Sequence, residues 1–189
     1  MVLAEELKNY TKSAHAALEG RMIPAIKSIR TGGDYTRLLR LFYGYYAALE
    51  TKIAPQVCDK LPDFEARRKA QSILSDMAAI DGGSVAATTL CNTLPDITSY
   101  PQALGAMYVL EGSTLGGQII SNMIRQRLQE AGGALSFFEG YGEQTAAMWQ
   151  RFKLLLEDDF SETEKAALLY AANDTFVSFQ KWIAAHDAR

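Results

Sequence analysis

Three glycines interrupt a stretch that otherwise has the composition of a long helix: Gly112, Gly116 and Gly117, within residues 108–118. A helix turns by about 100° per residue, so Gly105, Gly112 and Gly116 fall within about 40° of one another on one face. Each glycine inside a helix costs roughly 1 kcal/mol relative to alanine. Such a stripe is stable only when something packs against the bare backbone, either a neighbouring helix or a flat ligand. Spacing alone favours the helix.

Apolar residues recur at helical spacing along the whole chain, and no segment alternates with a period of two. With 189 residues, the chain is expected to form one all-α domain over residues 1–189. Paired glycines predict breaks at 81–84 and 132–133, and Ser161 with Glu164 predicts a capping box. A short additional helix is expected within residues 85–96. The main expected helices span residues 3–20, 34–56, 64–81, 100–131, 142–158 and 161–185.

His15 is one of only two histidines, and the other, His186, lies among the last four residues, where helices fray. The first expected helix has an apolar stripe and ends at Gly20, a common C-cap residue. His15 lies at the edge of that stripe. Glu19 follows one turn later, where its carboxylate can accept a hydrogen bond from Nδ1 and leave Nε2 available to a metal. A half-buried histidine with an ordinary helix neighbour is the alternative, and it is the commoner case.

Charge and cysteine content exclude several classes of function. The net charge of −3 gives no basic surface for a nucleic acid. Cys58 and Cys91 lie far apart without ligand spacing, which indicates free thiols in a reducing cytosol rather than a zinc or CxxC site. No segment has about 18 uninterrupted apolar residues, and the first residues lack the layout of a signal peptide. We therefore expect a cytoplasmic protein without nucleic-acid binding or membrane insertion.

Four blocks of the sequence resemble the heme oxygenase family, and they occur in the family's order. They are residues 13–19 (SAHAALE), 108–117 (YVLEGSTLGG), 137–142 (FFEGYG) followed by Trp149 and Phe152, and 176–182 (FVSFQKW). The chain is most similar to the bacterial branch that includes bacteriophytochrome-associated heme oxygenases. The resemblance implies a helical bundle with heme between the first helix and the glycine-containing helix. It therefore reverses the preferences stated above for His15 and for the glycine stripe.

The resemblance also implies roles for individual residues. His15 is the expected axial ligand of the heme iron, with Glu19 beside it. Gly112, Gly116 and Gly117 are expected to let the backbone lie so close to the iron that dioxygen is directed sideways, toward a meso carbon. Cations for the heme propionates and an aromatic wall on the last helix complete the expected site: Lys8, then Arg151, and Phe176 with Phe179.

Ser113 marks a departure from the mammalian-type pattern, which has an aspartate at this position. The bacterial branch also reads Gly-Ser-x-Leu-Gly-Gly, so the serine does not argue against activity. Proton delivery is then expected to rest on waters held by backbone groups, by Ser113 or by Thr114. The aromatic cluster of Phe42, Tyr43, Tyr45 and Tyr46 is expected to pack in the core rather than against a ligand.

The implied reaction uses dioxygen and external electrons to convert heme into biliverdin, carbon monoxide and ferrous iron, so heme is both cofactor and substrate. The expected partners are an electron donor, such as a ferredoxin or a reductase, and a biliverdin acceptor, such as a bacteriophytochrome. A heme carrier or sensor on the same fold is the alternative. A di-iron oxidase is disfavoured, because neither histidine has a glutamate three residues earlier. A plain helical interaction domain leaves the glycine stripe without a cause.

Overall fold

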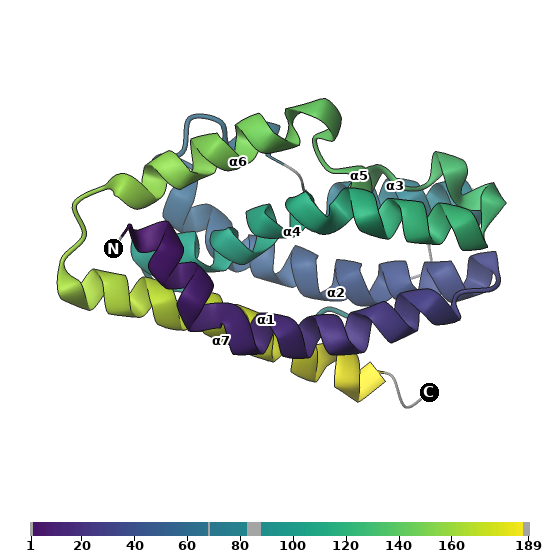
Figure 1. The fold of residues 1–189 in the computed structure, drawn as a ribbon, viewed down its shortest axis with the longest axis horizontal. Coiled ribbons are helices and arrows are strands. Elements are labelled where there is room, and N and C mark those ends of the chain that lie inside the picture. Colours follow the sequence, from purple (N-terminus) through teal and green to yellow (C-terminus); the bar gives the residue numbers. More distant parts are fainter. Residues whose placement is uncertain (1, 68, 83–87, 187–189) are drawn as a thin grey trace.

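The computed structural model describes residues 2–67, 69–82 and 88–186, which form seven α-helices and no strand (Figure 1). The prediction of an all-α fold is confirmed. No helix in these ranges combines the length and the apolar character of a membrane span. The helices are α1 (Leu3–Ser28), α2 (Gly32–Val57), α3 (Gln71–Ile80), α4 (Tyr100–Arg127), α5 (Ser136–Glu139), α6 (Thr145–Leu154) and α7 (Glu162–His186). Short 3-10 helices lie at η1 (Phe64–Ala66), η2 (Gln129–Gly133), η3 (Gly142–Gln144) and η4 (Leu155–Glu157).

Helix α4 is the centre of the arrangement, because it contacts α1, α2, α5, α6 and α7. Helix α1 runs along α7, and α6 lies on the opposite side of the molecule (Figure 1). Aromatic rings from three of these helices form the core between them. The ring of Phe42 on α2 lies 5.2 to 5.8 Å, centroid to centroid, from the rings of Tyr46, Phe137, Phe138 and Phe179.

Two helices begin at reciprocal capping boxes. At the start of α2, the Asp34 backbone N–H donates to Thr31 Oγ1 over 3.2 Å, and the Thr31 N–H donates to Asp34 Oδ2 over 3.0 Å. At the start of α7, Ser161 and Glu164 make the same exchange, which confirms the predicted box. Each box satisfies two backbone donors that a helix otherwise leaves without partners.

The predicted end of the first helix at Gly20 is wrong, because α1 continues to Ser28. The additional turns bury Ile26 completely, and Ile29 follows directly and is also buried. Burying two such side chains contributes several kcal/mol, roughly 1.5–3 kcal/mol each. That gain offsets the cost of keeping Gly20 and Pro24 inside the helix, which is about 4 kcal/mol for the two residues together.

The predicted helix over residues 64–81 is also wrong, since among the described residues of this range only η1 and α3 are helical. Between them Arg67 adopts an extended conformation, with φ −77° and ψ 148°. This conformation turns its guanidinium toward Asp63 and Glu111, to which it forms ion pairs. The pairing of Arg67 with Glu111 joins residues far apart in the chain, so nothing in the local sequence predicts that the helix is interrupted here.

Smaller differences concern the ends of the other elements. Helix α4 ends at Arg127 rather than at 131, and the predicted helix over 142–158 consists of η3, α6 and η4. Of the short helix expected within 85–96, residues 85–87 lie outside the described residues, and residues 88–96 form no helix. Helix α5 was not predicted; it ends at Glu139, and the next residue, Gly140, has a φ of +59°, which favours glycine.

We predict opposite effects of alanine at two helical glycines. A Cβ on Gly105 would lie 2.2 Å from the carbonyl oxygen of Leu168 on α7, whereas a Cβ on Gly20 would meet nothing within 4 Å. Gly105→Ala should therefore lower the free energy of unfolding by about 1–3 kcal/mol or more. Gly20→Ala should raise it by roughly 0.5–1 kcal/mol. Urea unfolding followed by circular dichroism measures both, and equal effects would contradict the prediction.

Candidate functional site

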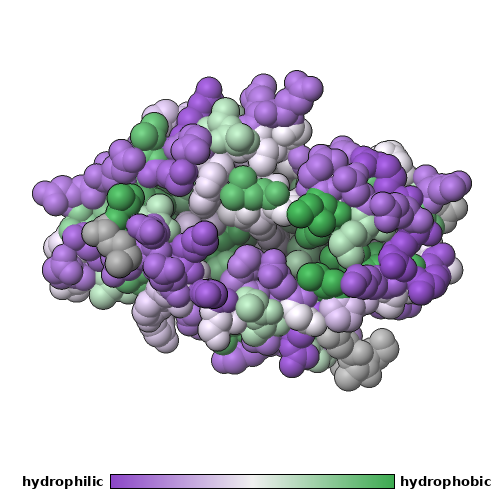
Figure 2. Space-filling model, viewed as in Figure 1, coloured by the Kyte–Doolittle hydropathy of each residue, from purple (hydrophilic) through white to green (hydrophobic). Residues whose placement is uncertain are grey.

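One cavity of about 540 Å³ extends between α1 and α4 and has the size of a small-molecule site. Figure 2 shows apolar side chains around a hollow near the middle of this face. Helix α1 lines the cavity with Lys8, Thr11, His15, Leu18, Glu19 and Met22. Helix α4 lines it with Tyr108, Val109, Gly112, Ser113, Leu115, Gly116 and Ile120. The remaining walls are aromatic: Phe42, Tyr46, Phe137, Phe138, Trp149, Phe176 and Phe179.

His15 and Glu19 lie on the α1 wall, one helical turn apart. The two residues are in contact, but through the nitrogen opposite to the one expected, because Nε2 lies 3.4 Å from Glu19 Oε1. Both side chains are about half exposed, at 52% and 51%. The imidazole also packs against Phe176 of α7, with the ring centroids 5.1 Å apart. The α1 wall therefore offers a nitrogen ligand that is accessible, braced on one side and able to turn.

The α4 glycines serve two different purposes. A Cβ on Gly116 would meet nothing within 4 Å, and one on Gly112 would make only ordinary contact, at 3.7 Å, with Trp149. Both glycines line the cavity. Gly117 does not; a Cβ there would lie 1.9 Å from the carbonyl oxygen of Phe138. Gly105 and Gly117 thus admit neighbouring backbones, while Gly112 and Gly116 leave a side-chain-free wall.

Ser113 adds a polar group to this wall. Its hydroxyl donates to the Leu110 carbonyl over 2.7 Å and accepts from the hydroxyl of Tyr46 on α2 over 3.3 Å. Thr114 is buried, does not line the cavity and donates to the Glu111 carbonyl. Burial also raises the pKa of the Tyr108 hydroxyl, which stays protonated at neutral pH. The polar atoms of the α4 wall are therefore uncharged.

The aromatic wall from α5 is held in place by a buried carboxylate on α3. Asp76 accepts from the backbone N–H of Ser136 over 3.0 Å and from that of Phe137 over 2.9 Å. It also accepts from the Ser136 hydroxyl over 2.6 Å. These bonds satisfy the first donors of a four-residue helix that is too short to be stable alone. Asp76 consequently fixes where Phe137 and Phe138 meet the cavity.

The structure brings together most, but not all, of the residues predicted for the site. Lys8, Phe176 and Phe179 line the cavity beside His15 and Glu19. Arg151 does not: it is exposed on α6, where its Nη1 lies 3.7 Å from the sulfur of Met148. Helical periodicity cannot distinguish residues that line the cavity from Arg151. It shows on which face of a helix a residue lies, but not what packs against that face.

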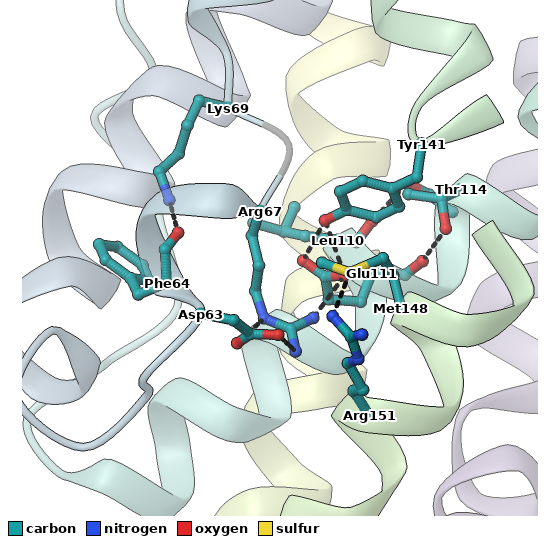
Figure 3. A network of polar contacts seen from close by, with 11 residues as sticks. Asp63, Phe64, Arg67, Lys69, Leu110, Glu111, Thr114, Tyr141, Met148 and Arg151 are labelled. Atoms are coloured by element: carbon teal, nitrogen blue, oxygen red, sulfur yellow. Dashed lines mark hydrogen bonds and ion pairs between the residues drawn. The ribbon is translucent and has the colours of Figure 1, made fainter. Parts of the chain in front are cut away.

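Sequence reasoning missed a cluster of buried charges beside α4 (Figure 3). Glu111 accepts from Arg67 Nη1 over 2.9 Å and from the Tyr141 hydroxyl over 3.0 Å. Arg67 also donates to both carboxylate oxygens of Asp63. Sequence reasoning also placed Phe42 and Tyr46 in the core rather than against a ligand. Both rings are buried in the core, yet both also line the cavity.

The chain is similar to several known proteins along nearly its whole length. A heme oxygenase of Xanthomonas campestris pv. campestris (strain 8004) is 28% identical over 153 residues, which are 80% of this chain and 89% of that protein. The solved heme oxygenase of Leptospira interrogans superposes with a TM-score of 0.77 at 21% identity, covering 98% of this chain and 100% of that one. The NO- and CO-bound heme oxygenase of Neisseria meningitidis gives 0.75 at 14% identity, covering 100% and 93%.

Because their sequence identities to this chain are low, the two solved structures establish its fold alone. The family itself follows from the sequence, which matches the heme oxygenase family model over residues 1–185. Because this match spans nearly the whole chain, the protein belongs to the heme oxygenase family of heme-degrading enzymes.

Proposed function

We propose that the large cavity binds heme between α1 and α4, and that the protein opens the ring to biliverdin, carbon monoxide and ferrous iron. The observation that carries the proposal is that His15 and the bare backbone at Gly116 line one cavity from different helices. The residues present fit a heme. The volume is that of a small-molecule site, the walls combine aromatic and aliphatic side chains with few polar ones, and no side chain fills the space at Gly116.

The α1 wall would hold the heme. We assign His15 as the residue that would hold the heme iron, through a neutral imidazole nitrogen. Coordination through Nε2 requires the ring to turn so that Nδ1 faces Glu19, and the half-exposed side chains leave room for this. Glu19 then orients the imidazole. We assign the propionates to Lys8, which lines the cavity, rather than to Arg151, which does not.

The α4 wall would control where dioxygen can react. Bound heme supplies the iron at which dioxygen is activated and is itself the substrate. The bare backbone at Gly112 and Gly116 would lie against a bound heme and, being fixed, would restrict the directions from which dioxygen could react. Phe137 and Phe138 exclude water from the adjacent side, and Ser113 places a hydroxyl on the α4 wall between the two glycines. Gly117 acts indirectly, by admitting the backbone of α5.

We further propose that the chain belongs to the bacteriophytochrome-associated branch, on the strength of Gly-Ser-x-Leu-Gly-Gly at residues 112–117. On this assignment a ferredoxin or a reductase provides the electrons, and a bacteriophytochrome accepts the biliverdin. Cys58 and Cys91 are free thiols, which fits an enzyme that acts in the reducing cytoplasm.

Hemin and then ascorbate, added to the purified protein, test the proposed function. We expect a histidine-type Soret band on addition of hemin. Ascorbate should then remove this band and produce the red absorbance of biliverdin. Binding without ring opening would identify a carrier or sensor instead, and absence of binding would refute the assignment of the cavity.

The two histidines provide a matched pair of variants for the axial ligand. His15→Ala should lose the histidine-type spectrum, because it removes the only imidazole that lines the cavity. His186→Ala should leave the spectrum unchanged. That imidazole packs on Trp182, with ring centroids 3.9 Å apart, and its Nδ1 lies 2.8 Å from the Trp182 carbonyl. An unchanged spectrum in His15→Ala would show that another group binds the iron.

Variants of the adjacent glycines Gly116 and Gly117 distinguish a glycine that faces the ligand from one that packs against a neighbouring backbone. Gly116→Leu should keep the fold and weaken hemin binding by about tenfold or more, because the new side chain enters the cavity. Gly117→Ala should instead lower the free energy of unfolding by about 1–3 kcal/mol, because its Cβ collides with the Phe138 carbonyl. Hemin titration and urea unfolding of both variants measure these effects. Normal turnover in a folded Gly116→Leu variant would remove the glycine wall from the site.

A further inference from the structure

Asp76 is a buried carboxylate on the core-facing side of α3. The residue is only 1% exposed, and Ile73 and Met77, on the same face of the helix, are completely buried. A carboxylate among apolar side chains is costly unless hydrogen bonds replace its lost water. The first residues of α5 provide these bonds, through the backbone N–H groups of Ser136 and Phe137 and the Ser136 hydroxyl. The burial of Asp76 therefore joins α3 to α5, which lie side by side (Figure 1).

Two further contacts hold the segment around α5. The hydroxyl of the buried Tyr35 on α2 donates to the Ala134 carbonyl, just before α5, over 2.6 Å. At the other end of α5, Glu139 forms an ion pair with Arg125 of α4. The two side chains of that pair are 40% and 41% exposed, so water screens the pair and it contributes little. The buried bonds to Asp76 and Tyr35 consequently carry most of the attachment.

The attachment of α5 determines where the aromatic wall meets the large cavity. Phe137 and Phe138 are consecutive, deeply buried and both part of that wall. The Phe137 N–H donates to Asp76, and the Phe138 carbonyl lies against Gly117, where a Cβ would come within 1.9 Å. Helix α5 is thus held between a carboxylate of α3 and bare backbone of α4. Without the carboxylate, buried N–H donors would lose their partners, so α5 would shift and carry both rings with it.

On the basis of the heme oxygenase function proposed above, we propose that Asp76 is a positioning residue for ring opening. It acts through α5, by holding Phe137 and Phe138 in the positions from which they shield one side of the ring. Asp76 itself does not line the cavity, so it would contact neither heme nor dioxygen. Because its bonds form without a ligand, the wall exists before heme binds, and binding need not order it. The position of the wall would then limit both the escape of heme and the ring carbons that dioxygen can reach.

Asp76→Asn tests the proposal with little change in side-chain size. The new amide has one acceptor oxygen, and its NH2 group would face a donor on α5, so at least one bond is lost. Asp81→Asn is the matched control, because Asp81 directly follows α3 and its carboxylate contacts Thr36 and Arg40 of α2. Ser136→Ala is the milder variant, since it removes the hydroxyl and keeps both backbone donors.

We expect Asp76→Asn to release hemin about tenfold faster than the wild-type protein, because a buried donor on α5 loses its partner. Transfer of hemin to an excess of apomyoglobin measures this rate. The ratio of biliverdin isomers, separated by chromatography, should also shift. Ser136→Ala should change both quantities in the same direction but by less, and Asp81→Asn should match the wild-type protein.

Amide hydrogen exchange of the hemin-free protein separates positioning from general stability. In Asp76→Asn, exchange should accelerate at residues 136–140 and stay near wild-type rates in α1 and α7. A general loss of stability would instead accelerate exchange in all helices and leave the isomer ratio of the folded enzyme unchanged. In the double variant Asp76→Asn with Ser136→Ala, the effects should be less than additive, because both residues belong to one set of bonds.

A folded Asp76→Asn variant with wild-type hemin release, isomer ratio and exchange at α5 would overturn this role of Asp76. Equal changes in Asp81→Asn would also overturn it, because they would show a general effect of removing a charge at α3. If Asp76→Asn does not fold, Ser136→Ala decides the question by the same three measurements. Failure of the wild-type protein to bind hemin or to form biliverdin would instead overturn the proposed function. Exchange in the hemin-free protein would then still show whether Asp76 holds α5.

Discussion

The contact between bare backbone on α4 and the carbonyl of Leu168 on α7 sets the geometry on which the rest of the molecule depends. A side chain at Gly105 would collide with that oxygen. In the same way, a side chain at Gly117 would collide with the carbonyl oxygen of Phe138. These two contacts fix α4 against α7 and α5. The register between them then determines that Gly112 and Gly116 face the cavity instead of a neighbour. One stripe of glycines therefore packs the helix and opens the site at once.

Buried charge lies beside this helix for a reason that packing does not explain. Burying Arg67 and Glu111 costs several kcal/mol per ion before pairing, and such pairs are often no better than apolar side chains of equal volume. Here each partner has further hydrogen bonds: Arg67 also donates to Asp63, and Glu111 also accepts from Tyr141. The cluster fixes the extended segment at Arg67 across α4.

Local signals predicted the elements that depend on neighbours in sequence. The Ser161 capping box and the helical periodicity are of this kind, and so is the pairing of His15 with Glu19 one turn apart. Long-range contacts set the rest. The burial of Ile26 carries α1 past Gly20, the ion pair of Arg67 breaks the expected helix over 64–81, and Asp76 creates α5. Gly116 and Gly117 are adjacent in the sequence, and only the position of Phe138 distinguishes their roles.

The two walls of the large cavity differ in rigidity, and this difference suits the chemistry proposed. The α4 wall is fixed by backbone contacts. Because Gly112 and Gly116 have no side chains, its shape there cannot change by side-chain movement. On the α1 wall, the groups that would bind a ligand are Lys8, His15 and Glu19, all of which have exposed side chains that can adjust. A flat ring would therefore be bound by side chains of the adaptable α1 wall, and the fixed α4 wall would restrict access to it. Selectivity for one edge of the ring requires that control to be rigid, whereas the bond to an imidazole only requires that the imidazole can reach.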